Sequence, residues 1–301
     1  MKAVIQVENK HTSRLIKAFQ GFNEDLEPFS TAPQGMFGRV AIIKSGNVTL
    51  NSENLDIEFV IPFDDDTEAN EAEIIVYNLS KTTLQGLKYN ASISVEAGYK
   101  NDTGVIFNGF ISDIKTKWES VDKITTLKAL DDMNLKERDI VEKTYKKGTK
   151  ASYILKDLIG MIKLPLAVFR VKRDHTYKDE VKVSGQLMQN IRKYAEVCGI
   201  SVYINKSKIY ARHISEGDNT NFIINASTGL IGIPEEFTET ITAEDYEDTI
   251  NGYKAECVLQ HRLTTASIVK LESRNANGTY RVCSGEHRFN EDEAITKIKM
   301  Y

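Results

Sequence analysis

Apolar and polar side chains alternate along most of the chain, in short runs that are separated by turn residues. The clearest runs lie at residues 74–80, 91–99 and 104–114. In a sheet with one buried face every second side chain enters the core, so this alternation predicts antiparallel β-strands. Similar runs occupy residues 39–43, 48–50, 55–61, 114–118 and 123–130. Many short strands without long helices indicate a barrel or a sandwich over residues 37–143.

Turn residues between these runs make more local predictions. Residues 44–47 predict a hairpin between the first two strands, and residues 119–122 predict another. Pro62 is expected to end the strand that begins near Leu55. Asn108–Gly109 is a strong hairpin signal, yet the alternation continues on both sides of it. A bulge within one long strand is therefore an equal alternative.

A helical period replaces the strand pattern from residue 144 onward. A helix capped by Thr149 or Ser152 is predicted to run to about Lys163. The apolar side chains of one face would be Ile154, Leu155, Leu158, Ile159 and Ile162. This face predicts that the helix packs on a core of its own segment.

A second helix is predicted over residues 184–197, with Gly199 as its end. Two strand-like runs follow at residues 200–204 and 208–212, joined by a short turn. Together with the first helix they predict a small α/β module over residues 144–215.

Residues 216–301 return to the strand pattern. The strand-like runs are 252–259, 267–272, 278–283 and 294–300. Turns are predicted at 277–278 and at 290–293. We expect a second β-domain here. Because its last predicted strand reaches residue 300, we expect that removal of a few C-terminal residues would damage it.

The first 36 residues have the weakest pattern. Leu15, Ile16 and Phe19 allow a short amphipathic helix over residues 11–22, and Pro28 and Pro33 interrupt any regular element. We expect a leader or arm over residues 1–36, followed by β-domains at 37–143 and 216–301 and the module between them.

Composition limits the class of protein. The chain has 301 residues, of which 41% are hydrophobic and 27% are charged, which is typical of a soluble globular protein. No apolar run approaches the roughly 20 residues of a membrane helix, and the N-terminus lacks a secretory signal. We therefore expect no membrane partner and a protein made in a cytoplasm. Three cysteines are too few for a disulfide framework.

Charge is distributed unevenly. Residues 144–215 carry 15 Lys and Arg against 5 Asp and Glu, whereas both flanking segments are acidic. The basic side chains that could follow a phosphate backbone are Lys146, Lys147, Lys150, Lys172, Arg173, Arg192 and Lys193. The segment has no nucleic-acid motif, and its aromatic residues are not interleaved with the basic ones as stacking platforms would be. Docking to an acidic protein surface, or simple solvation, is favoured over nucleic acid.

The sequence contains no familiar catalytic motif. It has no phosphate-binding glycine loop, no Gly-x-Ser-x-Gly elbow and no His-Glu-x-x-His helix. The acidic run at residues 64–66 lacks the spacing of a calcium loop, so we interpret it as a solvated loop. We assign no catalytic, cofactor-binding or metal-binding residue.

Two cysteines and two histidines give the only arrangement that suggests a metal. Cys257 and His261, and Cys283 and His287, are each four residues apart, and together they could form a tetrahedral zinc site. On a strand, residues four apart are separated by about 13 Å, so each pair would have to bend to converge. Two partly buried cysteines and two surface histidines are the favoured interpretation, and we expect no cofactor.

Several local strings resemble one known family, the baseplate hub proteins of contractile-tailed bacteriophages and R-type bacteriocins. The strings are Ile-Ile-Val-Tyr-Asn-Leu-Ser at 74–80, Val-Glu-Ala-Gly-Tyr at 95–99, Lys-Gly-Thr at 147–149, Gly-Leu-Ile-Gly-Ile-Pro at 229–234, His-Arg-Leu-Thr at 261–264, Ser-Ile-Val-Lys-Leu-Glu-Ser at 267–273 and Asn-Gly-Thr-Tyr-Arg-Val at 277–282. The resemblance covers most of residues 37–301.

The resemblance implies a fold and a role. The fold class is α+β, mostly β, with two tube-like antiparallel β-barrel domains and the small α/β module between them. The role is that of a non-enzymatic, homotrimeric adaptor in a virion or bacteriocin particle, assembled in the bacterial cytoplasm. It would join the sixfold tail tube to the threefold central spike, beside other baseplate and tape-measure proteins. The rival class is a cell-wall glycan-processing enzyme or carbohydrate-binding protein on a β scaffold, which would need a cleft with paired carboxylates.

Overall fold

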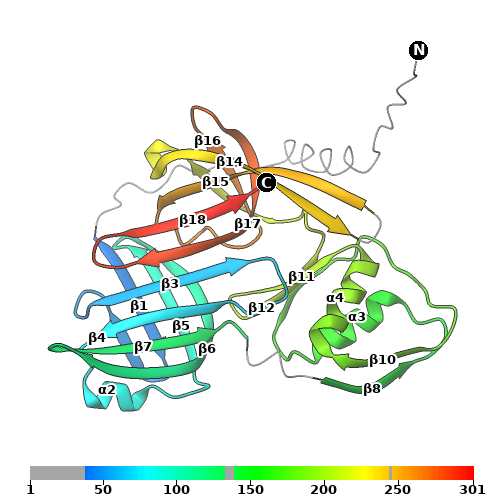
Figure 1. Ribbon diagram of the computed structural model, residues 1–301, viewed down its shortest axis with the longest axis horizontal. Helices are drawn as coiled ribbons and strands as arrows, with labels where there is room; N and C mark the ends of the chain where they lie inside the picture. The colour runs from blue at the N-terminus through cyan, green and yellow to red at the C-terminus, as the bar shows by residue number, and fades with distance from the viewer. Residues whose placement is uncertain (1–37, 133–138, 244–245) are drawn as a thin grey trace.

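A computed structural model describes residues 38–132, 139–243 and 246–301, so the expected leader and its helix over residues 11–22 lie outside the described part. The structure is mostly β with a small helical module at one side (Figure 1). The mostly-β class with an α/β module is therefore confirmed.

The first β region contains the strands predicted from the alternation. They are β1 (Arg39–Ser45), β2 (Val48–Asn51), β3 (Ile57–Asp64), β4 (Glu71–Tyr77), β5 (Ser92–Tyr99), β6 (Asp102–Glu119) and β7 (Asp122–Leu130), with a short helix α2 (Lys81–Gly86) after β4. Both predicted hairpins are present, because β1 pairs antiparallel with β2 and β6 with β7. The alternating apolar side chains are buried, as in β3, where every second residue from Ile57 to Phe63 faces the interior.

The Asn108–Gly109 signal lies inside the single long strand β6 and forms no hairpin. The prediction of one long strand is confirmed, but its bulges lie on either side of the signal: the register shifts at Ile106 against β5 and at Ser112 against β7, while Asn108 and Gly109 pair regularly with Ser94 and Ile93. A Cβ at Gly109 would lie 2.3 Å from the carbonyl oxygen of Leu130, and glycine therefore allows β7 to approach closely.

Pro62 does not end its strand, so this prediction is wrong. It lies within β3, opposite Glu286 of β17 (Asn277–Phe289). The pairing of β3 with β4 stops at Val60, so the later part of β3 has an edge that pairs with no strand in the described chain. Proline has no backbone N–H to donate to a neighbouring strand, and it is therefore tolerated where one edge of its strand is unpaired.

The module has its own core and two short sheets. Its elements are β8 (Asp139–Tyr145), α3 (Ala151–Gly160), β9 (Leu166–Phe169), β10 (Val181–Gln186), α4 (Leu187–Cys198), β11 (Ser201–Asn205) and β12 (Lys208–Arg212). All five predicted apolar residues of the first helix are buried, and Gly199 ends α4 in the left-handed region at φ 66°. The pattern missed β8, β9 and β10.

The predicted caps of α3 are wrong. Its N-cap is Lys150, whose side chain makes no capping hydrogen bond. The carboxylate of Asp174 accepts hydrogen bonds from the backbone N–H and the hydroxyl of Ser152 instead, at 3.0 and 2.7 Å. A carboxylate from a distant loop thus satisfies a donor at the helix N-terminus and complements the helix dipole.

The C-terminal region contains β13 (Asp218–Ile224), the 3₁₀ helix η3 (Ala226–Thr228), β14 (Leu230–Ala243), β15 (Tyr246–Val258), β16 (Ser267–Glu272), β17 and β18 (Ala294–Met300). The turn at 290–293 is confirmed by a hydrogen bond from the Asn290 N–H to the Glu293 carbonyl. Residues 277–278 already belong to β17, and the turn before them occupies residues 273–276.

The strands do not close into two separate barrels, contrary to the expectation. In the described chain one 13-stranded sheet runs in the order β14-β15-β18-β17-β3-β4-β7-β6-β5-β1-β2, with β13 and β16 attached through β17. The reason is that β17 pairs antiparallel with β3, which joins the C-terminal strands to the N-terminal ones. The red and orange strands of Figure 1 therefore continue into the blue and cyan ones.

The turn between β11 and β12 attaches the module to the large sheet. Ser207 Oγ donates to the carbonyl oxygens of Asn108 and Asp131, and Lys206 Nζ donates to that of Val105. On the other side, Thr264 Oγ1 donates to Asn205 Oδ1 at 3.0 Å. Three residues of one turn thus contact β6 and the segment after β7 on one side and the loop between β15 and β16 on the other.

A buried acid lies beside this turn. Asp131 is 2% exposed and accepts hydrogen bonds from the backbone and side-chain nitrogens of Asn70, at 2.9 and 3.0 Å. Burial raises the pKa of Asp131 to about 7, against which the Asn70 hydrogen bonds lower it. The carboxyl group is therefore protonated at pH values where an unfolded chain would have it ionised.

We predict that Asp131→Asn flattens the pH dependence of stability. A carboxyl whose folded pKa is raised contributes stability below its unfolded pKa of about 4, and this contribution is lost as pH rises through 7. Thermal unfolding at pH 4.5 and 7.5 should show that the wild type loses more stability across this range than the variant. The exposed Asp56→Asn is the control and should follow the wild type. Equal slopes for wild type and Asp131→Asn would refute the prediction.

Candidate assembly interface

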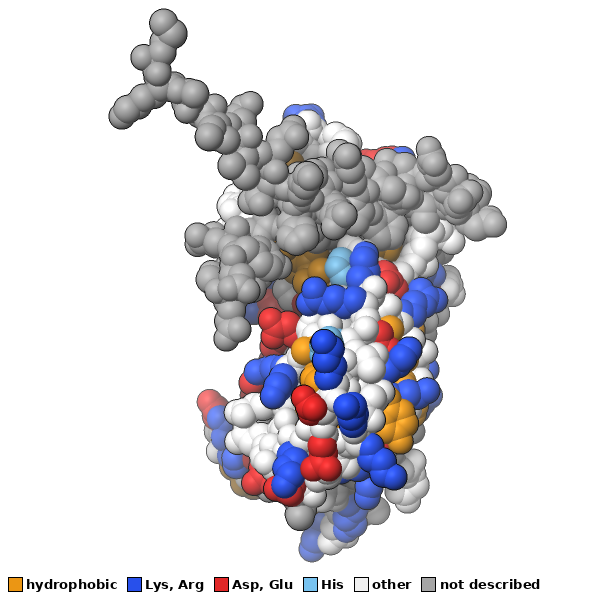
Figure 2. All heavy atoms as spheres, turned by 90° about the vertical axis from the view of Figure 1, so that its right-hand side faces the viewer, with side chains coloured by type: hydrophobic (Ala, Val, Ile, Leu, Met, Phe, Trp, Pro, Cys, Tyr) orange, Lys and Arg blue, Asp and Glu red, His pale blue; other side chains and the backbone are white. Residues whose placement is uncertain are grey.

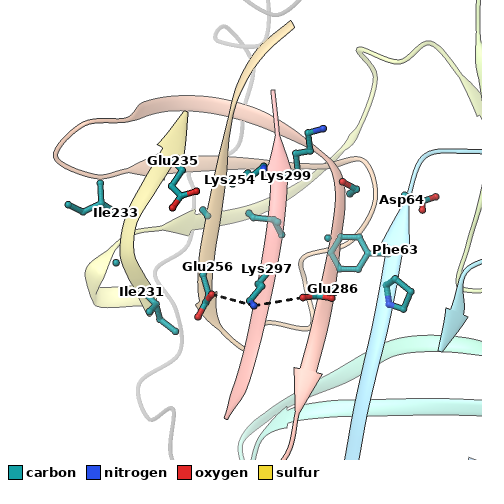
Figure 3. A pocket seen from close by; sticks show the side chains of 16 residues that line it. Phe63, Asp64, Ile231, Ile233, Glu235, Lys254, Glu256, Glu286, Lys297 and Lys299 are labelled. Atoms are coloured by element: carbon teal, nitrogen blue, oxygen red, sulfur yellow. Dashed lines mark ion pairs between the residues drawn. The ribbon is translucent and has the colours of Figure 1, made fainter. Parts of the chain in front are cut away.

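An open trough lies on the face of the sheet formed by β14, β15, β18, β17 and β3 (Figure 3). Its volume is about 690 Å³, and its floor is made of side chains and backbone from five neighbouring strands. Gly285 lies in this floor, and a Cβ there would be 2.6 Å from the ring of Phe63. The glycine therefore keeps the floor flat where Phe63 packs.

An apolar ridge of β14 forms one wall of the trough. Its register against β15 shifts between Ile231 and Glu235, and Gly232 has φ 68°, so the ridge residues are outside the regular ladder. Ile231 and Ile233 are 41% and 69% exposed. A second open hollow of about 1010 Å³ shares Gly232 and Ile233 with the trough, so Ile233 projects between two hollows. Exposed apolar side chains on such a ridge are typical of contact surfaces.

A row of alternating charge crosses the trough. Lys297 on β18 lies opposite Glu256 on β15 and Glu286 on β17, and its Nζ is 3.9 Å from a carboxylate oxygen of each. Figure 3 shows the lysine between the two acids. Cross-strand pairs of this kind, partly open to solvent, contribute little to stability. They give the floor a fixed pattern of charge for a partner surface to match.

Asp64 ends β3 at the other side of the trough. Burial raises its pKa to about 6, and the neighbouring Asp66 and Asp65 charges add to the shift. It is a weakly acidic group beside the ion pairs of Lys297 with Glu256 and Glu286.

The acidic run 64–66 is only partly the solvated loop that we expected. Asp65 Oδ2 accepts a hydrogen bond of 2.6 Å from Nη1 of Arg281, whose side chain is 1% exposed. Arg281 Nε also donates to the carbonyl of Glu216 at 2.9 Å, and the guanidinium lies over the ring of Tyr301. A buried arginine thus fixes this loop to β17, which the alternation did not reveal.

A second charge cluster fixes the loop after β15. Arg262 donates two hydrogen bonds of 2.7 Å to the carboxylate of Asp102, and His261 Nε2 lies 3.0 Å from the same group. The Arg262 hydrogen bonds lower the pKa of Asp102, so the acid stays ionised, while burial lowers the pKa of His261. The cluster joins β6 to the loop between β15 and β16.

The four residues that were considered as zinc ligands do not share one site. His261 contacts Asp102, and His287 Nδ1 is 2.9 Å from Thr296 Oγ1. The thiols of Cys257 and Cys283 point to different carbonyl oxygens of β18, those of Thr296 and Lys299. No group of three potential metal ligands occurs in the described ranges. The surface positions expected for the histidines are wrong, because His287 is fully buried and His261 is largely so.

The seven basic residues noted in the module do not form one continuous row, because four of them are engaged in separate contacts within this chain. Lys150 pairs with Asp174 at 3.7 Å, and Arg192 pairs with Glu68 at 3.6 Å and with the Thr67 hydroxyl. Arg173 donates to the carbonyls of Glu196 and Val197 at the end of α4, and Lys193 lies over the Tyr194 ring. Lys146, Lys147 and Lys172 are exposed and make no ion pair within the described residues. Figure 2 shows Lys and Arg over this side of the molecule.

Sequence reasoning found one part of this interface and missed the rest. The string at 229–234 was noted for its resemblance to a family, and it forms the apolar ridge. The trough floor was missed because it requires the pairing of β3 with β17. No helix in the described residues has the length and apolar character to cross a membrane.

The fold is that of tail proteins from phages and related secretion systems. Similar solved structures include a 43 kDa tail protein of prophage MuSo2 from Shewanella oneidensis (7% identity, 87% of this chain and 97% of that chain, TM-score 0.62) and a tail protein from Neisseria meningitidis (9%, 88% and 96%, 0.62). A type VI secretion system component from E. coli, described as structurally similar to bacteriophage T4 tail proteins, is also similar (11%, 86% and 76%, 0.58). A comparison with curated protein sequences finds no match.

Residues 39–288 match the family model of the baseplate hub gp41. The chain therefore belongs to the baseplate hub gp41 family, and its role is that of a structural protein in a phage baseplate. The resemblance noted from the sequence strings is confirmed.

We predict that Arg281→Met destabilises the fold by about 3 kcal/mol or more, because it leaves the Asp65 carboxylate without its partner in a largely buried position. The matched control is Arg288→Met on the same strand. Arg288 pairs with Glu286, but its side chain is 39% exposed, so we expect this substitution to destabilise the fold by less than about 1 kcal/mol. Urea unfolding measures both. Adding Asp65→Asn to Arg281→Met should recover part of the loss, and similar losses for the two arginine variants would contradict the assignment.

Proposed function

We propose that the chain is a homotrimeric hub that joins the tail tube to the central spike of a phage or bacteriocin particle. The single observation that carries this proposal is the open sheet. In the described chain the sheet ends at β14 and at β2, and β14 is 14 residues long. Long strands with a free edge invite pairing with another chain, and a closed ring of subunits covers such edges.

The apolar ridge supports a contact at this end of the sheet. Ile233 projects beside the free edge of β14, and Asn275 Nδ2 donates to the Pro234 carbonyl on that edge. Among the described residues, this hydrogen bond engages only one point of the edge. Protein interfaces combine an apolar centre with a polar rim. The trough has a concave shape, exposed isoleucines on its ridge and fixed charges on its floor, which suit such an interface.

Two such β regions in each subunit would give six in a trimer, which suits an adaptor between sixfold and threefold partners. On this proposal the tail tube protein and the spike protein contact opposite faces of the ring, and other baseplate and tape-measure proteins bind around it. The particle would be assembled in the bacterial cytoplasm.

We expect purified protein to have three times the 34.0 kDa mass of the chain in light scattering. Ile233→Asp should shift the mass toward the monomer, because it places a charge in the apolar centre of the contact. The same change at Tyr89, which is 61% exposed and lies after α2, is the control and should keep the trimer. A monomeric wild type at every concentration would contradict the trimer.

The rival glycan-processing function has one observation in its favour, the carboxylates of Glu256 and Glu286 in an open trough. The position of Lys297 argues against a catalytic dyad, since its ammonium group lies between the two carboxylates, in the space that a substrate or a water molecule would have to occupy. We propose that the protein is not an enzyme. Purified protein should release no soluble fragments from peptidoglycan, and release that is abolished by Glu256→Gln or Glu286→Gln would instead establish the enzyme.

A further inference from the structure

The hairpin of β6 and β7 projects beyond the strand beside it. β4 pairs with β7 only as far as Tyr77 opposite Ile124, whereas β6 and β7 continue to pair up to Glu119 opposite Asp122. The last residues of the hairpin therefore have no neighbouring strand on the β4 side. We call residues 118–123 the tip, which lies at the left-hand end of the molecule in Figure 1.

Two large apolar side chains of the tip face solvent. Trp118 is 72% exposed and Val121 is 82% exposed. Trp118 is also the only tryptophan of the chain. A tryptophan offers a large apolar area, and tryptophan is enriched among the residues that dominate the free energy of binding at protein interfaces. At the end of a projecting hairpin, these side chains are placed to enter a hollow on another molecule.

The tip is fixed to the segment that follows β4. Asn78 Nδ2 donates to Asp122 Oδ1, and the Lys123 N–H donates to Asn78 Oδ1, each at 2.9 Å. The Asn78 N–H also donates to the Lys123 carbonyl at 2.8 Å, and Lys123 Nζ donates to the Leu79 carbonyl. Asn78 has φ 57°, a conformation in which asparagine is enriched. A surface that is ordered before binding loses less conformational entropy when it binds.

The trough has the size and the lining that an indole ring requires. A cavity on the order of 150 Å³ holds a benzene ring, and the trough has about 690 Å³. Its ridge offers the exposed side chains of Ile231 and Ile233 for apolar contact. Lys254 and Lys297 also line it (Figure 3), and ammonium groups attract the face of an aromatic ring.

The tip cannot reach the trough of its own chain. The trough lies at the Asp64 end of β3, whereas the tip lies beyond the other end, where Ile57 pairs with Val76 of β4. The intervening residues of β3 span roughly 20 Å at the rise of a strand. One copy thus presents a projecting ring at one end of β3 and a hollow that fits it at the other end.

We propose that the tip of one copy inserts Trp118 into the trough of the next copy. The occupant is a second copy of this chain because the chain itself carries both complementary surfaces, in positions that only two copies can bring together. The contact is heterologous, and heterologous contacts build rings when the rotation between copies closes. The inference rests on the proposed trimeric hub and names two surfaces that join its subunits.

The single tryptophan makes the contact measurable in the unmodified chain. When wild-type protein assembles, Trp118 emission should shift to shorter wavelength and acrylamide should quench it less, because the ring leaves water. Dilution below the assembly concentration should reverse both changes. A trimer whose Trp118 is quenched as readily as that of the diluted protein would overturn the contact and leave the trimeric hub intact.

Truncation of the ring should weaken assembly. We expect Trp118→Ala to raise the concentration at which half of the protein is assembled by at least about tenfold in light scattering, as truncation of a central tryptophan does at other interfaces. Tyr153→Ala, at an exposed aromatic side chain of α3, is the matched control and should assemble as the wild type does. Thermal unfolding verifies that both variants are folded. Unchanged assembly of folded Trp118→Ala would overturn the contact.

A cross-link tests whether the trough is the receiving surface. Val121→Cys in one preparation and Ile233→Cys in another place thiols on the tip and on the ridge, while the three natural cysteines are buried. A short bis-maleimide added to the mixed preparations should give a covalent dimer, and Tyr153→Cys mixed with Ile233→Cys should give none. A trimer that buries Trp118 without this cross-link would overturn the trough as its site. A wild type that is monomeric at every concentration would overturn the trimer and this contact with it.

Discussion

The pairing of β3 with β17 is the contact on which the rest of the structure depends. It joins Phe59 to Phe289 and continues to Asp64 opposite Ser284, over more than 200 residues of sequence. The rings of Phe59 and Phe289 stack at 5.3 Å, and Phe63 lies 5.0 Å from His287. Closing so long a loop is entropically costly, so apolar burial along the whole pairing has to offset it. Without it the trough would lose the part of its floor that β3 supplies, including Phe63.

The Arg281–Asp65 pair extends this junction beyond the ladder. Burying a guanidinium is costly unless its charge and hydrogen bonds are matched. In Arg281 the Asp65 carboxylate and the Glu216 carbonyl match Nη1 and Nε beside the Tyr301 ring, whereas the buried Nη2 has no hydrogen-bond partner among the described residues. Such a pair contributes less net stability than apolar packing would. It forms only when the loop after β3 places Asp65 next to Arg281, so it restricts the conformation of that loop. It therefore fixes where β3 ends, and with it the position of Asp64 at the edge of the trough.

Local rules predicted much of the fold because they concern neighbours in sequence. The alternation located β1 to β7, and Gly199 marked the end of α4, since these features depend on backbone geometry and one buried face. The closure into barrels was wrong, and the trough was missed, because both depend on which distant strands pair. The caps of α3 failed for the same reason: Asp174, more than 20 residues away, replaced the local Thr149 or Ser152.

The dependence on residues distant in sequence also explains why an assembly surface is hard to recognise from a sequence. An active site needs a few groups at fixed positions, and their types often appear as a motif. The contact surface that we propose instead consists of an open strand edge, a ridge such as Gly232–Ile233 and a cluster of charges such as Glu256, Lys297 and Glu286. Each of these is ordinary by itself. On the proposed function they act together because one sheet joins both β regions, and the turn at 205–207 fixes the module against it. If the chain assembles as we propose, the property that serves assembly is the continuity of the sheet.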